Sequence, residues 1–262
     1  MKLIPEIVAR HTEHTAWRRD IHAHPELAYK EHRTAQFVAE KLTEFGIPFE
    51  SEIGGTGLVG TIRNGTSERS IGLRADMDAL PLQEFNEFAH RSQNDGVMHA
   101  CGHDGHTAML LAASEYLAKN RNFDGTVHVV FQPAEEGEAG AKAMMDDGLF
   151  ERFPMDAVYG MHNWPGHGVG KMATRSGPIM AAMDIFEIKI IGRGGHGALP
   201  HLSVDPILIA TQLVNQFQGI VSRNVNPVDA AVISVTQFHA GDAWAVIPTE
   251  AVIRGTVRSF RP

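Results

Sequence analysis

The chain has 262 residues, of which 43% are hydrophobic, and a formal net charge of −8. This length exceeds that of one typical small domain, and the apolar content is sufficient for a sizeable core. The negative charge and the lack of a basic run argue against a nucleic-acid partner. No run of about 18 apolar residues is present, so we expect no membrane span. A single cysteine and no apolar signal core favour a cytoplasmic protein.

Helical and strand patterns alternate in the first part of the chain. Apolar residues at helical spacing predict two helices over residues 4–45, separated near His24-Pro25. The pattern then predicts strands at residues 57–62, 70–75, 125–131 and 157–161, and helices at residues 107–117 and 139–145. This alternation predicts an α/β fold with a mostly parallel sheet flanked by helices.

The pattern changes near residue 179. A glycine- and histidine-rich loop is expected at residues 192–201. The other predicted elements are strands at residues 183–191, 231–238 and 251–257 and a long amphipathic helix at residues 205–221. The order strand-helix-strand-strand predicts a smaller α+β domain. We therefore expect one domain over residues 1–178 and a second over residues 179–262.

One short stretch, residues 98–106 with the sequence MHACGHDGH, combines residue types that a packed core does not need. Cys101 and His103 are two positions apart, so their side chains share a face in an extended segment. Thiolate and imidazole suit zinc or a similar transition metal. Two ligands so close in sequence cannot complete a site, and we expect further ligands from other strand ends.

Acidic and histidine residues follow the next predicted strands. Glu135 and Glu136 come after the strand at residues 125–131. Neighbours in an extended chain point in opposite directions, so one carboxylate can bind metal while the other faces a water molecule. His162 is a further ligand candidate, and Asp78 could accept a hydrogen bond from a ligand imidazole. This division of roles is typical of a hydrolase with a carboxylate general base.

Simpler interpretations exist for each residue alone. A lone cysteine is usually a buried small hydrophobe, and paired acids after a strand are usually solvated. Asp76 and Asp78 could merely cap a turn. Cys101 beside a histidine also permits a cysteine hydrolase, which leaves the residues at the other strand ends without a role. The zinc deaminase pattern Pro-Cys-x-x-Cys is absent. Co-occurrence at successive strand ends favours the metal site.

Several segments resemble the M20 metallopeptidase family, in particular its amidohydrolase branch. This branch includes hippurate hydrolases, N-acyl-amino-acid amidohydrolases and plant auxin-conjugate hydrolases. The matching segments are His24-Pro25-Glu26-Leu27, residues 74–81 (RADMDALP), residues 98–107 (MHACGHDGHT), residues 132–137 (QPAEEG), Gly160-Met161-His162, and residues 194–198 (GGHGA) with Pro200 and His201.

The resemblance implies a zinc-peptidase-like catalytic domain with one or two divalent ions, which would be Zn, Mn, Co or Ni. The residues on the family's ligand positions are Cys101, His103, Glu136 and His162. Glu135 falls on the general base and Asp78 on the acid that orients a ligand. The smaller domain would serve in dimerisation or as a lid, which implies a homodimer or homo-oligomer. His196 matches a histidine that reaches the partner's active site, and we expect His196 and Asn163 to contact substrate.

Family members run beyond this length and return to the catalytic sheet with a final histidine ligand. The chain ends at Pro262 without that segment, so we expect a fragment or a naturally short protein. The first hypothesis is a metal-dependent amidohydrolase whose small-molecule substrates are N-acyl amino acids, such as hippurate, or related small amides. The alternatives are a catalytically silent metal-binding or dimerising module, and a metal aminopeptidase or dipeptidase.

Overall fold

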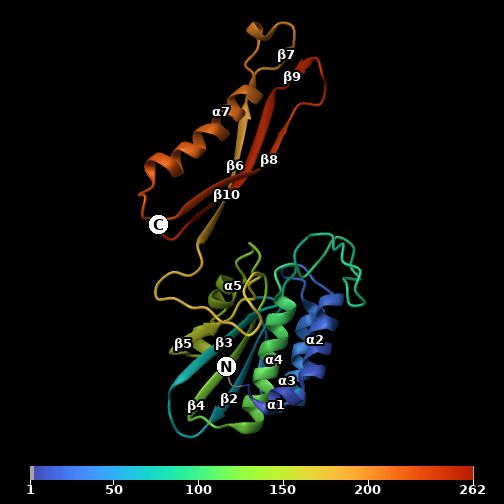
Figure 1. Cartoon of the computed structure of the whole chain (residues 1–262), viewed down its shortest axis with the longest axis vertical. Helices are drawn as coiled ribbons and strands as arrows, with labels where there is room; N and C mark the ends of the chain where they lie inside the picture. Colours follow the sequence, from blue (N-terminus) through green and yellow to red (C-terminus); the bar gives the residue numbers. More distant parts are fainter. Residues whose placement is uncertain (1–2, 262) are drawn as a thin grey trace. The chain divides into compact units, whose positions relative to one another are not determined.

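The structure is a computed structural model that describes residues 3–261. The chain forms two compact units, which divide between Gly170 and Lys171 (Figure 1). This division falls a few residues before the expected boundary at residue 179. Each unit is described by itself.

Helices and strands alternate in the first unit. Its elements are α1 (Pro5–Ala9), α2 (His11–Ala23), α3 (His32–Glu44), β1 (Phe49–Ile53), β2 (Gly57–Asn64), β3 (Ser70–Asp76), α4 (His103–Asn120), β4 (Gly125–Gln132), α5 (Gly140–Asp146), α6 (Leu149–Arg152) and β5 (Ala157–Gly160). The predicted strands thus occur where the apolar runs place them. The first predicted helix is two helices, because the chain leaves helical geometry at Arg10. The edge strand β1 was not predicted, because its middle residues are polar and exposed.

The sheet of the first unit has the strand order β1-β2-β4-β3-β5. β3 pairs in parallel with β4 and with β5, whereas β2 is antiparallel to both β1 and β4. The predicted α/β class is confirmed, and the sheet is mixed rather than mostly parallel. Because β3, β4 and β5 run in the same direction, their carboxyl ends meet at one edge, where open α/β sheets bind ligands.

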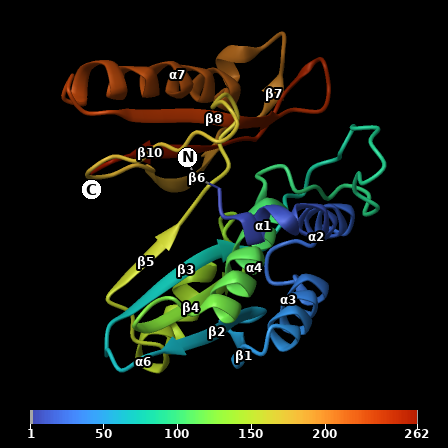
Figure 2. The same cartoon turned by 60° about the horizontal axis from the view of Figure 1, so that its bottom comes forward.

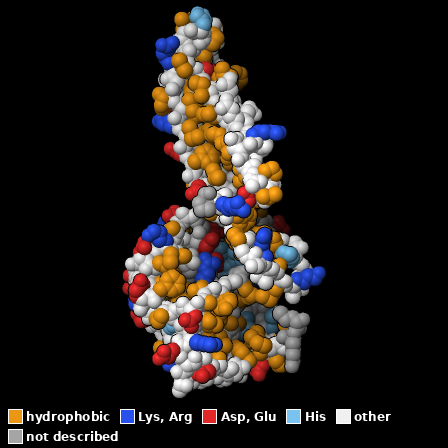
Figure 3. Space-filling model, turned by 90° about the vertical axis from the view of Figure 1, so that its left-hand side faces the viewer, with side chains coloured by type: hydrophobic (Ala, Val, Ile, Leu, Met, Phe, Trp, Pro, Cys, Tyr) orange, Lys and Arg blue, Asp and Glu red, His pale blue; other side chains and the backbone are white. Residues whose placement is uncertain are grey.

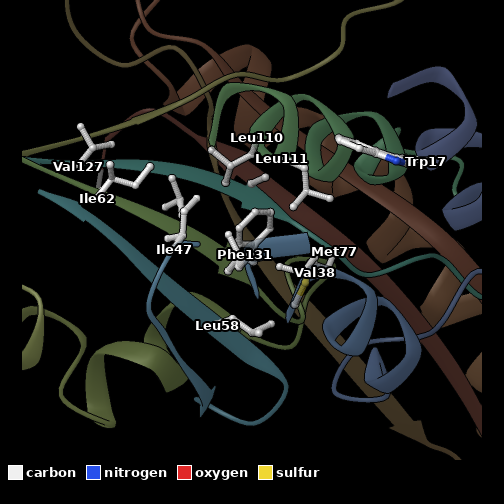
Figure 4. Packing of buried hydrophobic residues seen from close by; sticks show 13 residues of the cluster. Trp17, Val38, Ile47, Leu58, Ile62, Met77, Leu110, Leu111, Val127 and Phe131 are labelled. Atoms are coloured by element: carbon white, nitrogen blue, oxygen red, sulfur yellow. The ribbon is translucent and has the colours of Figure 1, made fainter. Parts of the chain in front are cut away.

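Helices cover both faces of this sheet (Figure 2). On one face α3 and α4 pack against the strands and α2 packs against α4. Figure 4 shows Trp17, Val38, Leu111 and Phe131 in this core. The other face is covered by α5 and α6. Its buried residues are Ile53, Val59, Val130, Met144, Leu149 and Phe153. The central strand β4 is buried on both sides, which explains its nearly continuous apolar sequence.

The second unit is a small α+β structure. Its elements are β6 (Ala182–Ile191), β7 (Gly195–His196), η1 (Pro200–Leu202), α7 (Pro206–Gly219), η2 (Ile220–Asn224), β8 (Ala231–Ala240), β9 (Val246–Ile247) and β10 (Glu250–Ser259). The antiparallel sheet β6-β10-β8 packs against α7 through Ile190, Ala210 and Ile253. Asp205 caps α7, since its Oδ1 accepts a hydrogen bond from the Ile207 N–H at 2.9 Å.

Large apolar side chains are also exposed on both units. In the first unit they include Val158 and Tyr159 of the edge strand β5. In the second unit they include Leu208 and Ile209 of α7, and Figure 3 shows hydrophobic side chains along this unit. Within residues 3–261, no helix has the length and apolar character needed to cross a membrane.

Replacing Leu111 by alanine tests the main core of the first unit. Leu111 is fully buried on α4, so Leu111→Ala should lower the free energy of unfolding by about 2–5 kcal/mol. Met109 on the same helix is 38% exposed, and Met109→Ala should cost about 0.5 kcal/mol or less. Urea unfolding measures both changes, and equal losses would contradict this description of the core.

Candidate metal centre

The residues predicted as metal ligands come from the edge where the parallel strands end. Glu136 follows β4, His162 follows β5, and His103 is the first residue of α4. Gly102, between Cys101 and His103, has a φ of 89° in the left-handed region that favours glycine. A Cβ atom at Gly102 would also lie 2.8 Å from Nδ2 of Asn163. The glycine therefore allows the chain to turn sharply between the thiol and the imidazole.

The side chains of these residues converge. Cys101 Sγ lies 3.3 Å from His162 Nε2. His103 Nε2 lies 3.9 Å from Glu135 Oε2 and 3.9 Å from Glu136 Oε1. Within each of the groups Cys101/His103/His162 and His103/Glu135/Glu136, the potential ligand atoms lie within 4.8 Å of one another. His103 belongs to both groups and so connects them into one cluster.

Two buried atoms of this cluster fit a divalent ion. His103 Nε2 and Glu136 Oε1 have no hydrogen-bond partner among the described residues, although both are inaccessible to solvent. A buried polar atom without a partner costs about 1–3 kcal/mol, so a ligand that satisfies both atoms is favoured. Thiolate, imidazole and carboxylate together match the ligands of zinc and similar metals.

Asp78 connects the two sides of the cluster. Its Oδ1 lies 3.2 Å from His103 Nδ1, and its Oδ2 accepts a hydrogen bond from the Glu136 N–H at 2.9 Å. Burial opposes ionisation of Asp78, but these hydrogen bonds outweigh it and lower its pKa. Burial likewise opposes the charge on His103, but the contact with Asp78 raises the pKa of His103 to about 11. An ion at Nε2 would therefore displace a proton from His103.

The two neighbouring glutamates differ in exposure. The Glu135 side chain is 42% exposed and the Glu136 side chain is 24% exposed. Burial is the main cause that raises the pKa of Glu136, while the nearby thiol of Cys101 opposes this shift. Glu135 is therefore the more accessible carboxylate of the pair.

Asp76 and His106 also belong to this region, and the sequence interpretation assigned no role in the site to either. Asp76 Oδ1 lies 2.6 Å from His106 Nδ1, and its Oδ2 accepts from Arg74 at 2.7 Å. Burial opposes ionisation of Asp76, but His106 and Arg74 hold its pKa well below the usual range. The available signals were the position of Asp76 at a strand end and of His106 one helical turn after His103.

His106 also links Asp76 to the segment that carries His162. The Asn163 N–H donates to His106 Nε2 at 2.9 Å. His162 Nδ1 lies 2.6 Å from the carbonyl oxygen of Asn163, which leaves His162 Nε2 facing Cys101. The Asn163 side chain donates to the Gly102 carbonyl at 3.0 Å. Asn163 therefore holds the cluster together, and its contact with substrate stays a prediction.

The remaining predicted residue, His196, lies in β7 of the second unit. It is exposed, and its Nδ1 accepts a hydrogen bond from the Ala198 N–H at 3.1 Å. Its role stays a prediction. In the first unit, a cavity of ≈ 500 Å³ opens beside Cys101 and His162 and is also lined by His99 and Trp164. This cavity offers room for a small molecule next to the cluster.

A cluster of potential metal ligands with an accessible carboxylate beside it, at the strand ends of an α/β fold, is typical of metal-dependent hydrolases. The sequence model of the family described as Peptidase family M20/M25/M40 matches residues 72–259. The chain belongs to this family.

Similar proteins agree with this assignment. The chain is 51% identical over 260 residues to a hippurate hydrolase of Campylobacter jejuni, covering 99% of this chain and 68% of that protein. It is 48% identical over 251 residues to an N-acyl-L-amino acid amidohydrolase of Geobacillus stearothermophilus, covering 95% of this chain and 67% of that protein. The crystal structure of the Bacillus subtilis YXEP protein, described as a dinuclear metal binding peptidase from the M20 family, superposes on this chain with a TM-score of 0.76. The two sequences are 38% identical, and the match covers 97% of this chain and 65% of that one. The chain thus spans about two thirds of the length of these relatives.

Replacing Asp78 by asparagine tests the connection between His103 and Glu136. An asparagine side chain can accept from only one of the two N–H donors, because its NH₂ group faces the other. Asp78→Asn should weaken zinc affinity about 10–100-fold, measured by competition with a chelator. Asp146→Asn, at an exposed carboxylate that pairs with Lys142, is the control and should leave the affinity unchanged. Equal affinities for both variants would contradict this role of Asp78.

Proposed function

We propose that the protein is a metal-dependent amidohydrolase that cleaves the amide bond of N-acyl amino acids. The observation that carries this proposal is the pair of buried atoms on His103 and Glu136 that have no partner in the described part of the chain, with the accessible Glu135 beside them. The relatives from Campylobacter jejuni and Geobacillus stearothermophilus, named for hippurate and N-acyl-L-amino acid hydrolysis, support this substrate class.

The residues that would hold one or two divalent ions are Cys101, His103, Glu136 and His162. Zn, Mn, Co and Ni are all compatible with these ligands. When bound, the ion supplies Lewis-acid chemistry, since it polarises the amide carbonyl and makes water more acidic. Asp78 keeps the His103 ring oriented with Nε2 toward the cluster.

Glu135 is the general base in this proposal. Its Oε2 lies 3.9 Å from His103 Nε2, so the carboxylate reaches the cluster without being buried in it. Glu135 takes a proton from the water that attacks the amide carbon. It then gives this proton to the amine nitrogen as the carbon–nitrogen bond breaks, which releases the acid and the amino acid.

The second unit has a separate role in the proposal. We infer that it serves in dimerisation or as a lid, and that the protein is a homodimer or homo-oligomer. His196 is exposed on this unit, so its side chain is accessible for the predicted contact with substrate. A cytoplasmic location rests on the single free cysteine.

Glu135→Gln tests the proposed base. Glutamine cannot accept the proton, so turnover should fall by roughly 10² or more, while zinc affinity stays close to that of the wild type. Glu138→Gln, at an exposed glutamate in the same loop, is the matched control and should keep full activity. Turnover of Glu135→Gln near the wild-type rate would remove Glu135 from this role.

A substrate panel separates the competing functions. Amide cleavage of N-acyl amino acids by the wild type supports the amidohydrolase, whereas cleavage of dipeptides alone supports an aminopeptidase or dipeptidase. Bound zinc without turnover on either class favours the catalytically silent module.

A further inference from the structure

The segment before α3, residues 26–31, contacts the chain that follows β3 and the chain that follows β4. On the β3 side, Leu27 forms a parallel bridge with Ala79, and the Ala79 N–H donates to the carbonyl of Glu26 at 2.8 Å. Ala79 directly follows Asp78. The segment therefore fixes the chain beside the carboxylate that joins His103 and Glu136.

The same segment holds the turn after β4. The Tyr29 hydroxyl donates to the Glu138 carbonyl at 2.8 Å. The Glu31 carboxylate accepts from the Ala134 N–H at 2.8 Å. Ala134 directly precedes Glu135. Residues 26–31 thus connect the chain beside Asp78 with the chain that carries the two glutamates.

Glu31 is a fully buried acid that the proposed reaction does not use. Its relative exposure is 0%, and no salt bridge involves it among the described residues. Its Oε1 accepts from the Ala134 N–H and its Oε2 from the Thr56 hydroxyl, at 2.8 and 2.5 Å. Both oxygens therefore have a partner, and the Thr56 contact orients the carboxyl group toward Ala134. Burying a carboxyl group is costly, so these contacts are needed to keep it in place.

The turn that Glu31 holds has an unusual backbone. Ala134 has a φ of 51°, a left-handed conformation that costs energy for every residue except glycine. Gly140 closes the turn by donating its N–H to the Ala134 carbonyl at 2.9 Å. A Cβ atom at Gly140 would collide with the Pro133 carbonyl, so only glycine fits where the turn closes on itself.

Glu135 lies between two backbone N–H groups that buried carboxylates hold. Glu31 accepts from Ala134 on one side, and Asp78 accepts from Glu136 on the other. Release of either N–H would let the backbone of Glu135 and Glu136 rotate. The side chains of both glutamates would then be held less firmly in the cluster.

We propose that Glu31 is a positioning residue, which holds the Ala134 N–H and thereby directs Glu135 and Glu136 toward the metal centre. Its effect on turnover through Glu135 rests on the proposed function. Its effect on metal affinity through Glu136 does not require turnover.

The test compares two replacements of Glu31. Glu31→Leu removes both acceptor oxygens, and it should weaken zinc affinity about 10–100-fold and lower kcat with a smaller change in KM. Glu31→Gln keeps an acceptor for Ala134 and places its NH₂ group toward the Thr56 oxygen, so its zinc affinity should stay near that of the wild type. Zinc affinity is measured by chelator competition, and the cobalt form gives a thiolate-to-metal absorption band as a second signal.

A double variant addresses the backbone directly. Glycine adopts positive φ readily, so Ala134→Gly removes the backbone strain at position 134 that the contact with Glu31 helps to maintain. Zinc affinity of Glu31→Leu combined with Ala134→Gly should recover part of the loss caused by Glu31→Leu. Absence of this recovery would contradict the claim that Glu31 acts through the Ala134 backbone.

Val38→Ala is the stability control. Val38 is fully buried on α3, and its removal should lower the unfolding temperature without changing zinc affinity. If Glu31→Leu matches Val38→Ala in zinc affinity and kcat, Glu31 only stabilises the fold and the proposal is wrong. If Glu31→Leu does not fold, Glu31→Asp, whose carboxylate is one methylene too short for Ala134, gives the same comparison.

The zinc measurement also separates this proposal from the proposed function. A wild-type chain that binds zinc but hydrolyses no N-acyl amino acid contradicts the function. In that case, weaker zinc binding by Glu31→Leu still supports the positioning role, and unchanged binding overturns it.

Discussion

The rest of the candidate metal centre depends on the buried carboxylate of Asp78. It lies against the His103 ring and accepts the N–H of Glu136, so it joins the start of α4 to the end of β4. The hydrogen bonds outweigh the cost of burial and keep Asp78 ionised. Without this carboxylate, the imidazole and the glutamate would take their orientations independently. His103 Nε2 and Glu136 Oε1 would then no longer point toward the same position.

The sheet supplies the geometry that Asp78 requires. β3 lies between β4 and β5 and is parallel to both, so three strand ends reach one edge. Further buried acids hold the chain around that edge. Asp76 acts through His106 on the segment of His162, and Glu31 contacts the turn before Glu135. The buried carboxylates around the candidate centre are therefore bound by backbone N–H groups, imidazoles, the Arg74 guanidinium and the Thr56 hydroxyl rather than by solvent.

Much of the fold could be predicted from the sequence, because the strands are apolar runs and the helices follow a clear period. The convergence of residues such as Cys101 and His162 follows from the rule that parallel strands end at one edge. The antiparallel pairing of β2 could not be predicted, since apolar runs do not encode direction. The contact of Glu31 with Ala134 could not be predicted either, because it joins residues 103 positions apart and depends on a left-handed alanine.

X-ray absorption at the zinc edge of the zinc-loaded chain tests the central claim most directly. The account predicts a sulfur scatterer at about 2.3 Å together with nitrogen and oxygen scatterers at about 2.0–2.2 Å. The sulfur contribution should disappear in Cys101→Ser, because Cys101 is the single cysteine of the chain. A wild-type shell of nitrogen and oxygen alone would contradict the proposed centre.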